Sequence, residues 1–81
     1  MFKVNIVHIS DRILHEGESD SVLLPGVVGE FEVGLQHAPI ASLLTSGKIW
    51  VRTAEKNSAR VVTIRQGLMR FDGKELYAVV E

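Results

Sequence analysis

Hydrophobic and polar residues alternate along much of this 81-residue chain. Phe2, Val4 and Ile6 are separated by Lys3 and Asn5, which is the period-two pattern of a strand that buries one face. Similar short runs, each bounded by a polar or glycine-containing turn, predict further strands at residues 12–15, 21–24, 30–35, 48–53, 59–65, 68–71 and 74–81.

The number and spacing of these runs predict an all-β fold. Turn signals recur about every 8–12 residues, which is typical of an antiparallel sandwich or barrel. Residues 40–44 are ambiguous, because their apolar positions have helical spacing in a run too short to settle the period. A polar turn is expected at residues 55–58, and the strongest hairpin signal is Asp72-Gly73, since both residue types tolerate positive φ. We expect one domain over residues 1–81.

The stretch 25–39 carries more local information than any other window. Pro25-Gly26 predicts a turn, because proline presets φ and glycine accepts positive φ. Residues 30–35 then alternate in the manner of a half-buried strand. His37-Ala38-Pro39 ends that strand, since proline has no N–H to donate to a ladder.

Composition and charge exclude several classes of protein. The chain has no cysteine, so disulfide frameworks, thiolate metal sites and thiol catalysis are excluded. Nine basic and ten acidic residues give a net charge of −1, which argues against a primary role in binding nucleic acid or anionic membranes. No apolar run approaches the roughly 18–20 residues that span a bilayer, and we expect a soluble, unprocessed protein.

Several predicted strands are apolar on both faces. They include residues 22–24, 49–51, 61–62 and 79–80. A small monomeric sandwich needs only one apolar face for each strand, so the surplus predicts a second surface covered by another protein. The alternative is scattered surface hydrophobes, which are common on soluble proteins.

Three histidines are candidates for chemistry, but the pattern around each favours a structural role. The sequence places no Ser, Cys or carboxylate partner beside His37, which is expected to cap a turn or lie at an interface. His8 and His15 lie in strand patterns and are expected to be partly buried or solvated. The run 15–18 offers three metal-ligating side chains without the H-E-x-x-H spacing of a helical zinc site.

The pair Glu30 and Glu32 and the residue Trp50 each have a chemical and a structural interpretation. Glu30 and Glu32 share a strand face, so a catalytic carboxylate pair is conceivable, although outward solvated charges are the default. Trp50 lies between Lys48 and Arg52, where it could stack on nucleic acid or sugar. A tryptophan in the core or at a subunit interface is the favoured interpretation.

Five motifs in a fixed order resemble the epsilon subunit of the bacterial-type rotary ATP synthase. The family has an opening strand, a short E-G-E turn, P-G-x-x-G-E, H-A-P, an S-L-L-x-x-G segment and a glycine-marked turn before its last hairpin. Their counterparts here are residues 16–18, 25–30, 37–39, 42–47 and 65–68. The resemblance covers the whole chain.

The resemblance implies an antiparallel β-sandwich of two sheets and about ten strands, without the C-terminal helical hairpin that usually follows it in the family. It implies a non-catalytic rotor subunit with no cofactor or metal, in a large hetero-oligomer on the cytoplasmic face of the bacterial inner membrane. Torque from proton flow through the membrane ring would reach the gamma subunit through this domain. The alternatives are a free-standing β-sandwich protein-binding module and a small hydrolase with a carboxylate site.

The resemblance also implies two sets of partner-binding residues. His37 and Ser42 match positions on the face against the gamma subunit. The turn that faces the polar loops of the membrane ring is matched by Val28, Gly29, Glu30 and Phe31.

Overall fold

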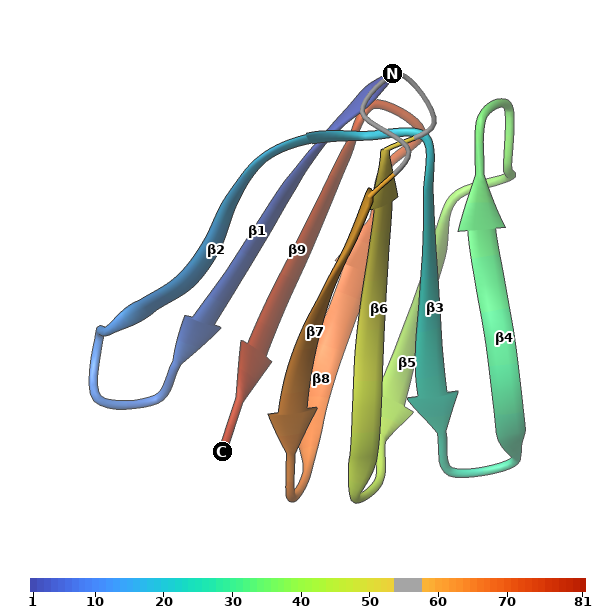
Figure 1. Cartoon of the computed structure of the whole chain (residues 1–81). Coiled ribbons are helices and arrows are strands. Elements are labelled where there is room, and N and C mark those ends of the chain that lie inside the picture. Colours follow the sequence, from blue (N-terminus) through green and yellow to red (C-terminus); the bar gives the residue numbers. More distant parts are fainter. Residues whose placement is uncertain (54–57) are drawn as a thin grey trace.

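The structure is a computed structural model that describes residues 1–53 and 58–81 (Figure 1). Within these ranges it is built from strands and turns, without a helix. The strands are β1 (Phe2–His8), β2 (Ile13–Ser19), β3 (Ser21–Gly26), β4 (Gly29–Gly34), β5 (Ile40–Leu44), β6 (Gly47–Thr53), β7 (Ser58–Ile64), β8 (Gly67–Phe71) and β9 (Glu75–Val80). The predicted all-β sandwich is confirmed, with nine strands in the described residues.

All nine strands belong to one hydrogen-bonded sheet that folds back on itself. Its order is β2-β1-β9-β8-β5-β3-β6-β7, and β4 pairs with the other edge of β3. In Figure 1, β7 and β6 lie in front of β8 and β5, so the sheet forms two layers. The five-stranded layer is β2-β1-β9-β8-β5 and the four-stranded layer is β4-β3-β6-β7. Every pair is antiparallel except β1 with β9, which is parallel.

The two layers meet at β3, which changes partner along its length. Its first half pairs with β6, from Ser21 opposite Arg52 to Leu23 opposite Trp50. At its end Gly26 pairs with Leu44 of β5. A strand that pairs with both layers turns one continuous sheet into a sandwich.

The core fills the space between the layers with inward-facing residues from every strand except β2, whose Leu14 packs against it. It consists of Phe2, Val4, Ile6, Val22, Leu24, Val33, Leu44, Ile49, Val51, Val62, Ile64, Met69, Phe71, Leu76, Ala78 and Val80. The rings of Phe2 and Phe71 make an edge-to-face contact with centroids 5.2 Å apart, a geometry that aromatic pairs favour. The period-two pattern therefore identifies the buried face of most strands correctly.

Strand β2 is longer than the sequence predicts. The predicted break at residues 16–18 is wrong, because β2 continues through them. Gly17 pairs with Val4 of β1 and shares its inner face, while Glu16 and Glu18 are exposed on the other side. Pairing along the whole of β1 supplies the ladder hydrogen bonds that offset the weak strand preference of these residues.

The predicted turn at Pro25-Gly26 is also wrong. Both residues belong to β3, and the hairpin turns at Val27-Val28, because Gly26 pairs with Gly29. The Pro25 carbonyl accepts a hydrogen bond from the Thr45 N–H at 2.8 Å. Glycine at position 26 serves close packing rather than a turn.

Two other predictions concern connections. The ambiguous residues 40–44 form β5. The hairpin at Asp72-Gly73 is confirmed, with β8 and β9 as its arms and three residues between them. The Asp72 carboxylate accepts hydrogen bonds from the N–H groups of Lys74 and Glu75 at 2.9 and 2.8 Å, which lowers the pKa of that carboxyl. The polar turn predicted at residues 55–58 lies outside the described residues, except that β7 begins at position 58.

Gly26→Ala tests whether close packing at the base of the β3–β4 hairpin requires glycine. A Cβ atom at position 26 would lie 2.8 Å from the Gly29 carbonyl oxygen and 2.9 Å from the Phe31 ring. We expect a loss of about 1–3 kcal/mol in unfolding free energy, as for other overpacked sites, measured by urea denaturation. Gly34→Ala is the matched control, because a Cβ atom there meets nothing within 4 Å. Equal effects of the two substitutions would contradict the packing argument.

Candidate functional site

The four residues predicted to face a membrane ring lie at one tip of the molecule. Val28 is fully exposed (100%) in the β3–β4 turn, and Gly29 and Glu30 beside it are exposed as well. Phe31 is half-buried and packs against the core. The tip therefore presents an apolar side chain and a carboxylate on a base that is anchored in the sandwich.

His37 and Ser42 lie on either side of the start of β5. The His37 ring contacts the Phe71 ring edge-to-face, with centroids 6.2 Å apart, and its Nδ1 lies 2.6 Å from the Ala38 carbonyl oxygen. Its backbone N–H donates to the Gly34 carbonyl at 3.3 Å. The Ser42 hydroxyl donates to the Leu43 carbonyl at 3.1 Å. The contacts of His37 are those of a residue that orders a loop.

The structure does not bring these two sets of residues together. The β3–β4 turn lies at the bottom of Figure 1 and the loop between β4 and β5 at the top. The strand β5 runs between the two levels, and its Leu43 carbonyl accepts a hydrogen bond from the Val27 N–H at 3.2 Å. The predicted residues therefore form two separate surfaces joined by β5.

The register of the five-stranded layer reveals a surface that the predicted site residues do not include. One outward residue from each strand lies opposite the next, which gives an apolar row across the whole layer. The row, from β2 to β5, is Ile13, Val7, Val79, Leu68 and Leu43. The strands are about 4.8 Å apart, so the row is about 19 Å long.

The row is accessible to a partner. Ile13 is 62% exposed, Leu68 54% and Leu43 59%, and Val27 beside Leu43 is also exposed. In sequence these residues lie far from one another and are indistinguishable from scattered surface hydrophobes. Val79 is the one member of the row that the both-faces pattern indicates, through the run 79–80. The other four members of the row become neighbours only through the register of the strand pairs.

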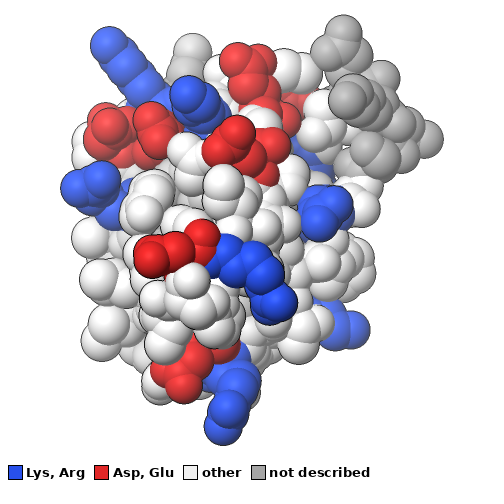
Figure 2. All heavy atoms as spheres, turned by 90° about the vertical axis from the view of Figure 1, so that its left-hand side faces the viewer, with Lys and Arg blue, Asp and Glu red and all other residues white. Residues whose placement is uncertain are grey.

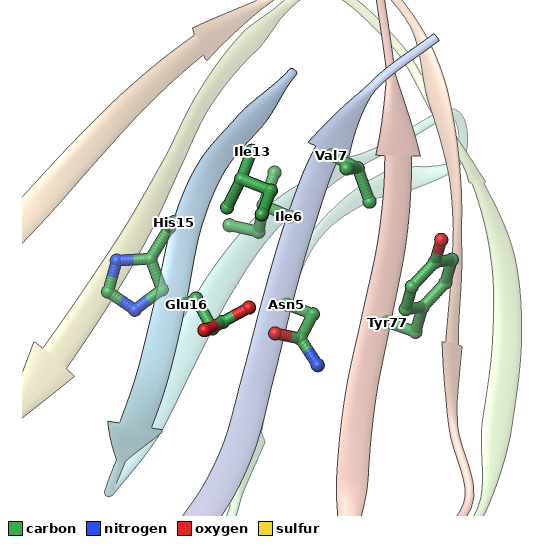
Figure 3. Close-up of a pocket in the computed structure, with 7 residues that line it drawn as sticks. All are labelled: Asn5, Ile6, Val7, Ile13, His15, Glu16 and Tyr77. Carbon is green, nitrogen blue, oxygen red and sulfur yellow. The ribbon is translucent and has the colours of Figure 1, made fainter. Parts of the chain in front are cut away.

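A polar row runs beside the apolar one on the same face. Asn5 lies opposite Glu16 on one side and Tyr77 on the other, and Tyr77 lies opposite Arg70. The Arg70 guanidinium lies 6.0 Å from the centre of the Tyr77 ring. Asn5, Glu16 and Tyr77 also line a shallow hollow of about 230 Å³ (Figure 3). Figure 2 shows acidic and basic side chains interspersed over the side of the molecule that carries β2.

The metal-site alternative at residues 15–18 fails on geometry. His15 lies opposite Ile6, whose side chain is buried, so it faces inward, whereas Glu16 and Glu18 are exposed. The His15 ring and the Glu16 side chain extend to opposite sides of β2 (Figure 3). Among the described residues no group of three or more His, Cys, Asp or Glu side chains could hold a metal ion.

The His15 ring lies where the two free edges of the sheet approach each other. Its Nε2 is buried and has no hydrogen-bond partner among the described residues. Arg60 of β7 reaches across to β2 and donates from Nη2 to the Leu14 carbonyl at 3.2 Å. Burial, and then the charge of Arg60, lower the pKa of His15. Both effects favour the neutral ring.

The remaining candidates lie on the outer face of the four-stranded layer. Glu32 forms an ion pair with Arg52 at 3.9 Å, with both side chains about half exposed, as in ordinary surface pairs. Trp50 is half-buried and lies opposite Leu23 on one side and Val61 on the other. The tryptophan belongs to a small apolar cluster rather than to a stack of basic and aromatic side chains.

Comparison with known proteins gives a consistent match. The family described as "ATP synthase, Delta/Epsilon chain, beta-sandwich domain" matches residues 1–81. The ATP synthase epsilon chain of Sulfurimonas denitrificans is 36% identical over 69 residues, covering 85% of this chain and 52% of that one. That of Leptospira borgpetersenii is 40% identical over 55 residues, covering 67% and 43%. The chain thus spans about half the length of these two relatives.

A relative of similar length and two solved structures complete the comparison. The epsilon chain of Chlorobium limicola is 31% identical over 80 residues, covering 99% of this chain and 89% of that one. A chain of the Euglena gracilis mitochondrial ATP synthase has a TM-score of 0.87 at 14% identity, covering 98% of this chain and 49% of that one. A chain of the Tetrahymena thermophila central stalk and c-ring has a TM-score of 0.77 at 11% identity, covering 98% and 62%. At these identities the solved structures establish the fold.

No helix long and apolar enough to cross a membrane occurs in the described part of the chain.

His15→Gln tests the buried neutral histidine. Because the pKa of His15 is lower in the folded state, its contribution to stability is complete above the unfolded value of about 6.5 and is lost as the pH falls through the folded value. The wild type should lose more stability than the variant between about pH 7.5 and about pH 5, measured by urea denaturation. Parallel losses in the two proteins would show that His15 does not titrate in this way.

Proposed function

Because the chain belongs to the family of ATP synthase delta/epsilon chain β-sandwich domains, we propose that it is a non-catalytic rotor subunit. In this role it joins the gamma subunit to the membrane ring of a proton-translocating rotary ATP synthase, on the cytoplasmic face of the bacterial inner membrane. The apolar row on the five-stranded layer is the single observation that carries the proposal. A sandwich with its own complete core has no internal use for this second apolar surface.

The apolar row and β5 form the proposed surface for the gamma subunit. Leu43 ends the row and directly follows Ser42, while His37 lies just before β5. The proposed gamma contact therefore runs along β5 and, from Leu43, over the outer face of the layer. Burial of a side chain such as Leu68 contributes about 1.5–3 kcal/mol, so a row of this kind can hold a stable complex.

The β3–β4 turn forms the proposed surface for the polar loops of the ring. Val28 offers an apolar contact, and Gly29 lets the backbone approach closely. Glu30 can accept a charge-assisted hydrogen bond from a basic residue in a ring loop. Phe31 anchors this turn to the core. Such rim contacts determine register and association rate more than affinity.

The proposed mechanism is mechanical. Torque from the ring enters at the turn and leaves through the gamma surface, and the sandwich between them must not deform. A close-packed core has low compressibility and transmits strain. Sharing one hydrogen-bonded sheet between both layers adds stiffness. No side chain of this chain is assigned a chemical step.

Leu68→Asp should abolish binding to the gamma subunit of the same organism, because it places an unpaired charge in the centre of the proposed interface. We expect affinity to fall at least about 100-fold in a binding assay with purified subunits. His37→Asp and Ser42→Arg should also weaken binding. Val61→Asp is the control, since Val61 is an exposed β-branched residue on the other layer.

Two outcomes would contradict this assignment. If Val61→Asp weakens binding as much as Leu68→Asp, the partner covers the other layer. If the wild type does not bind gamma at all, the free-standing protein-binding module becomes the better interpretation. Circular dichroism of each variant confirms that the domain remains folded.

A single cysteine at position 28 tests the ring contact, because the natural chain has no cysteine. A photo-crosslinker attached to Val28→Cys should capture a ring subunit in the assembled complex. The same reagent on Val61→Cys should not, because Val61 lies in β7, at the opposite edge of the four-stranded layer from β4. Capture of the ring at position 61 but not 28 would place the ring elsewhere on the sandwich.

A further inference from the structure

A second hollow lies where the free edge of β7 approaches the ends of β1 and β9. Its volume is about 420 Å³, which is within the usual range for small-molecule sites. The residues that line it are His8, Arg12, Leu14, Arg60, Val61, Val62, Thr63, Arg65, Val80 and Glu81. They come from three parts of the chain that only the folded sheet brings together.

The hollow is rich in cationic groups. Arg12, Arg60 and Arg65 all line it, and among the described residues no carboxylate lies within 4.0 Å of their guanidinium nitrogens. Arg60 donates from Nη2 to the Leu14 carbonyl, and its other N–H groups have no further hydrogen-bond partner among the described residues. Three arginines in one hollow are a notable concentration in a chain with a net charge of −1.

His8 adds a fourth donor. Its Nδ1 accepts a hydrogen bond from the Ser10 N–H at 3.1 Å and lies 2.7 Å from the Ser10 hydroxyl. In the neutral ring this leaves the proton on Nε2, which can donate to a ligand. Glu81 has the one side-chain carboxylate among the lining residues, and this carboxylate accepts a hydrogen bond from Gln66 at 2.6 Å.

The hollow occupies a gap in the hydrogen bonding of the fold. The strands β2 and β7 end the folded sheet and share no ladder within the described residues. Arg12 lies just before β2, whereas Arg60 and Arg65 lie in and just after β7. An anion that binds both groups of arginines would tie the two free edges together.

We propose that this hollow binds a small phosphate-bearing anion. Guanidinium groups form paired, charge-assisted hydrogen bonds with phosphate oxygens, and several of them suit a ligand with more than one negative charge. Leu14, Val61 and Val80 provide apolar walls beside these groups. The hollow shares no residue with the surfaces proposed for gamma and the ring, so this site stands independently of that function.

Isothermal titration with inorganic pyrophosphate at constant ionic strength tests the site. The wild type should bind, and its unfolding temperature should rise with pyrophosphate concentration, because the ligand bridges the two edges only in the folded state. Arg12→Gln and Arg65→Gln should each weaken binding roughly tenfold, the loss expected for one charge-assisted hydrogen bond. Inorganic phosphate should bind more weakly than pyrophosphate at the same site.

Two further variants make the test specific. Arg70→Gln removes the same charge from the outer face beside Tyr77, away from the hollow, and should leave affinity unchanged. Glu81→Gln removes the lining carboxylate and should tighten binding. Absence of binding heat and of thermal stabilisation up to about 10 mM pyrophosphate, a concentration far above useful affinity, would overturn the proposal. Equal weakening by Arg70→Gln and Arg12→Gln would overturn it too, since it would show non-specific charge attraction.

Discussion

The division of β3 between two partners is the constraint on which the rest of this structure depends. Its first half is hydrogen-bonded to β6 and its end to β5, so a single sheet passes from one layer to the other at this strand. The corner is tight, because a Cβ atom at Gly47 would lie 2.9 Å from the Pro25 Cβ. Thr45 closes it with a hydrogen bond to the Pro25 carbonyl. Without this corner the two apolar faces would not oppose each other, and there would be no core.

The same folding determines which surfaces remain for other proteins. Once alternate residues of each strand fill the core, the others must face outward, and strand register decides which of them become neighbours. In the five-stranded layer that register aligns one apolar residue from every strand, from Ile13 to Leu43. The β3–β4 hairpin projects beside the end of this row, with Val28 at its tip. These are the two surfaces proposed above for the gamma subunit and the membrane ring.

At the opposite side of the sandwich, strands β2 and β7 share no backbone ladder within the described residues, and a side-chain contact links them instead. The edges of β2 and β7 are linked by Arg60 rather than by backbone pairing within the described residues, and His15 faces inward nearby. A charge buried there would be costly, which explains why burial lowers the pKa of this histidine. Cationic groups gather at the mouth of the same gap, where solvent still reaches them. The gap between β2 and β7 is therefore where we expect pH, through His15, and a bound anion, through the arginines, to change the stability of the fold.

The sequence by itself determined the fold class, the buried face of most strands and the hairpin at Asp72-Gly73, because alternation and turn chemistry are local. The local pattern predicted a turn at Pro25-Gly26 and a break in β2 at residues 16–18, and both predictions are wrong. Pairing with neighbouring strands outweighs local preference at these positions. Only the tertiary structure decided that Leu43 and Leu68 are neighbours on one surface. Register and the closure of the sheet are long-range properties, and no local pattern specifies which distant residues they bring together.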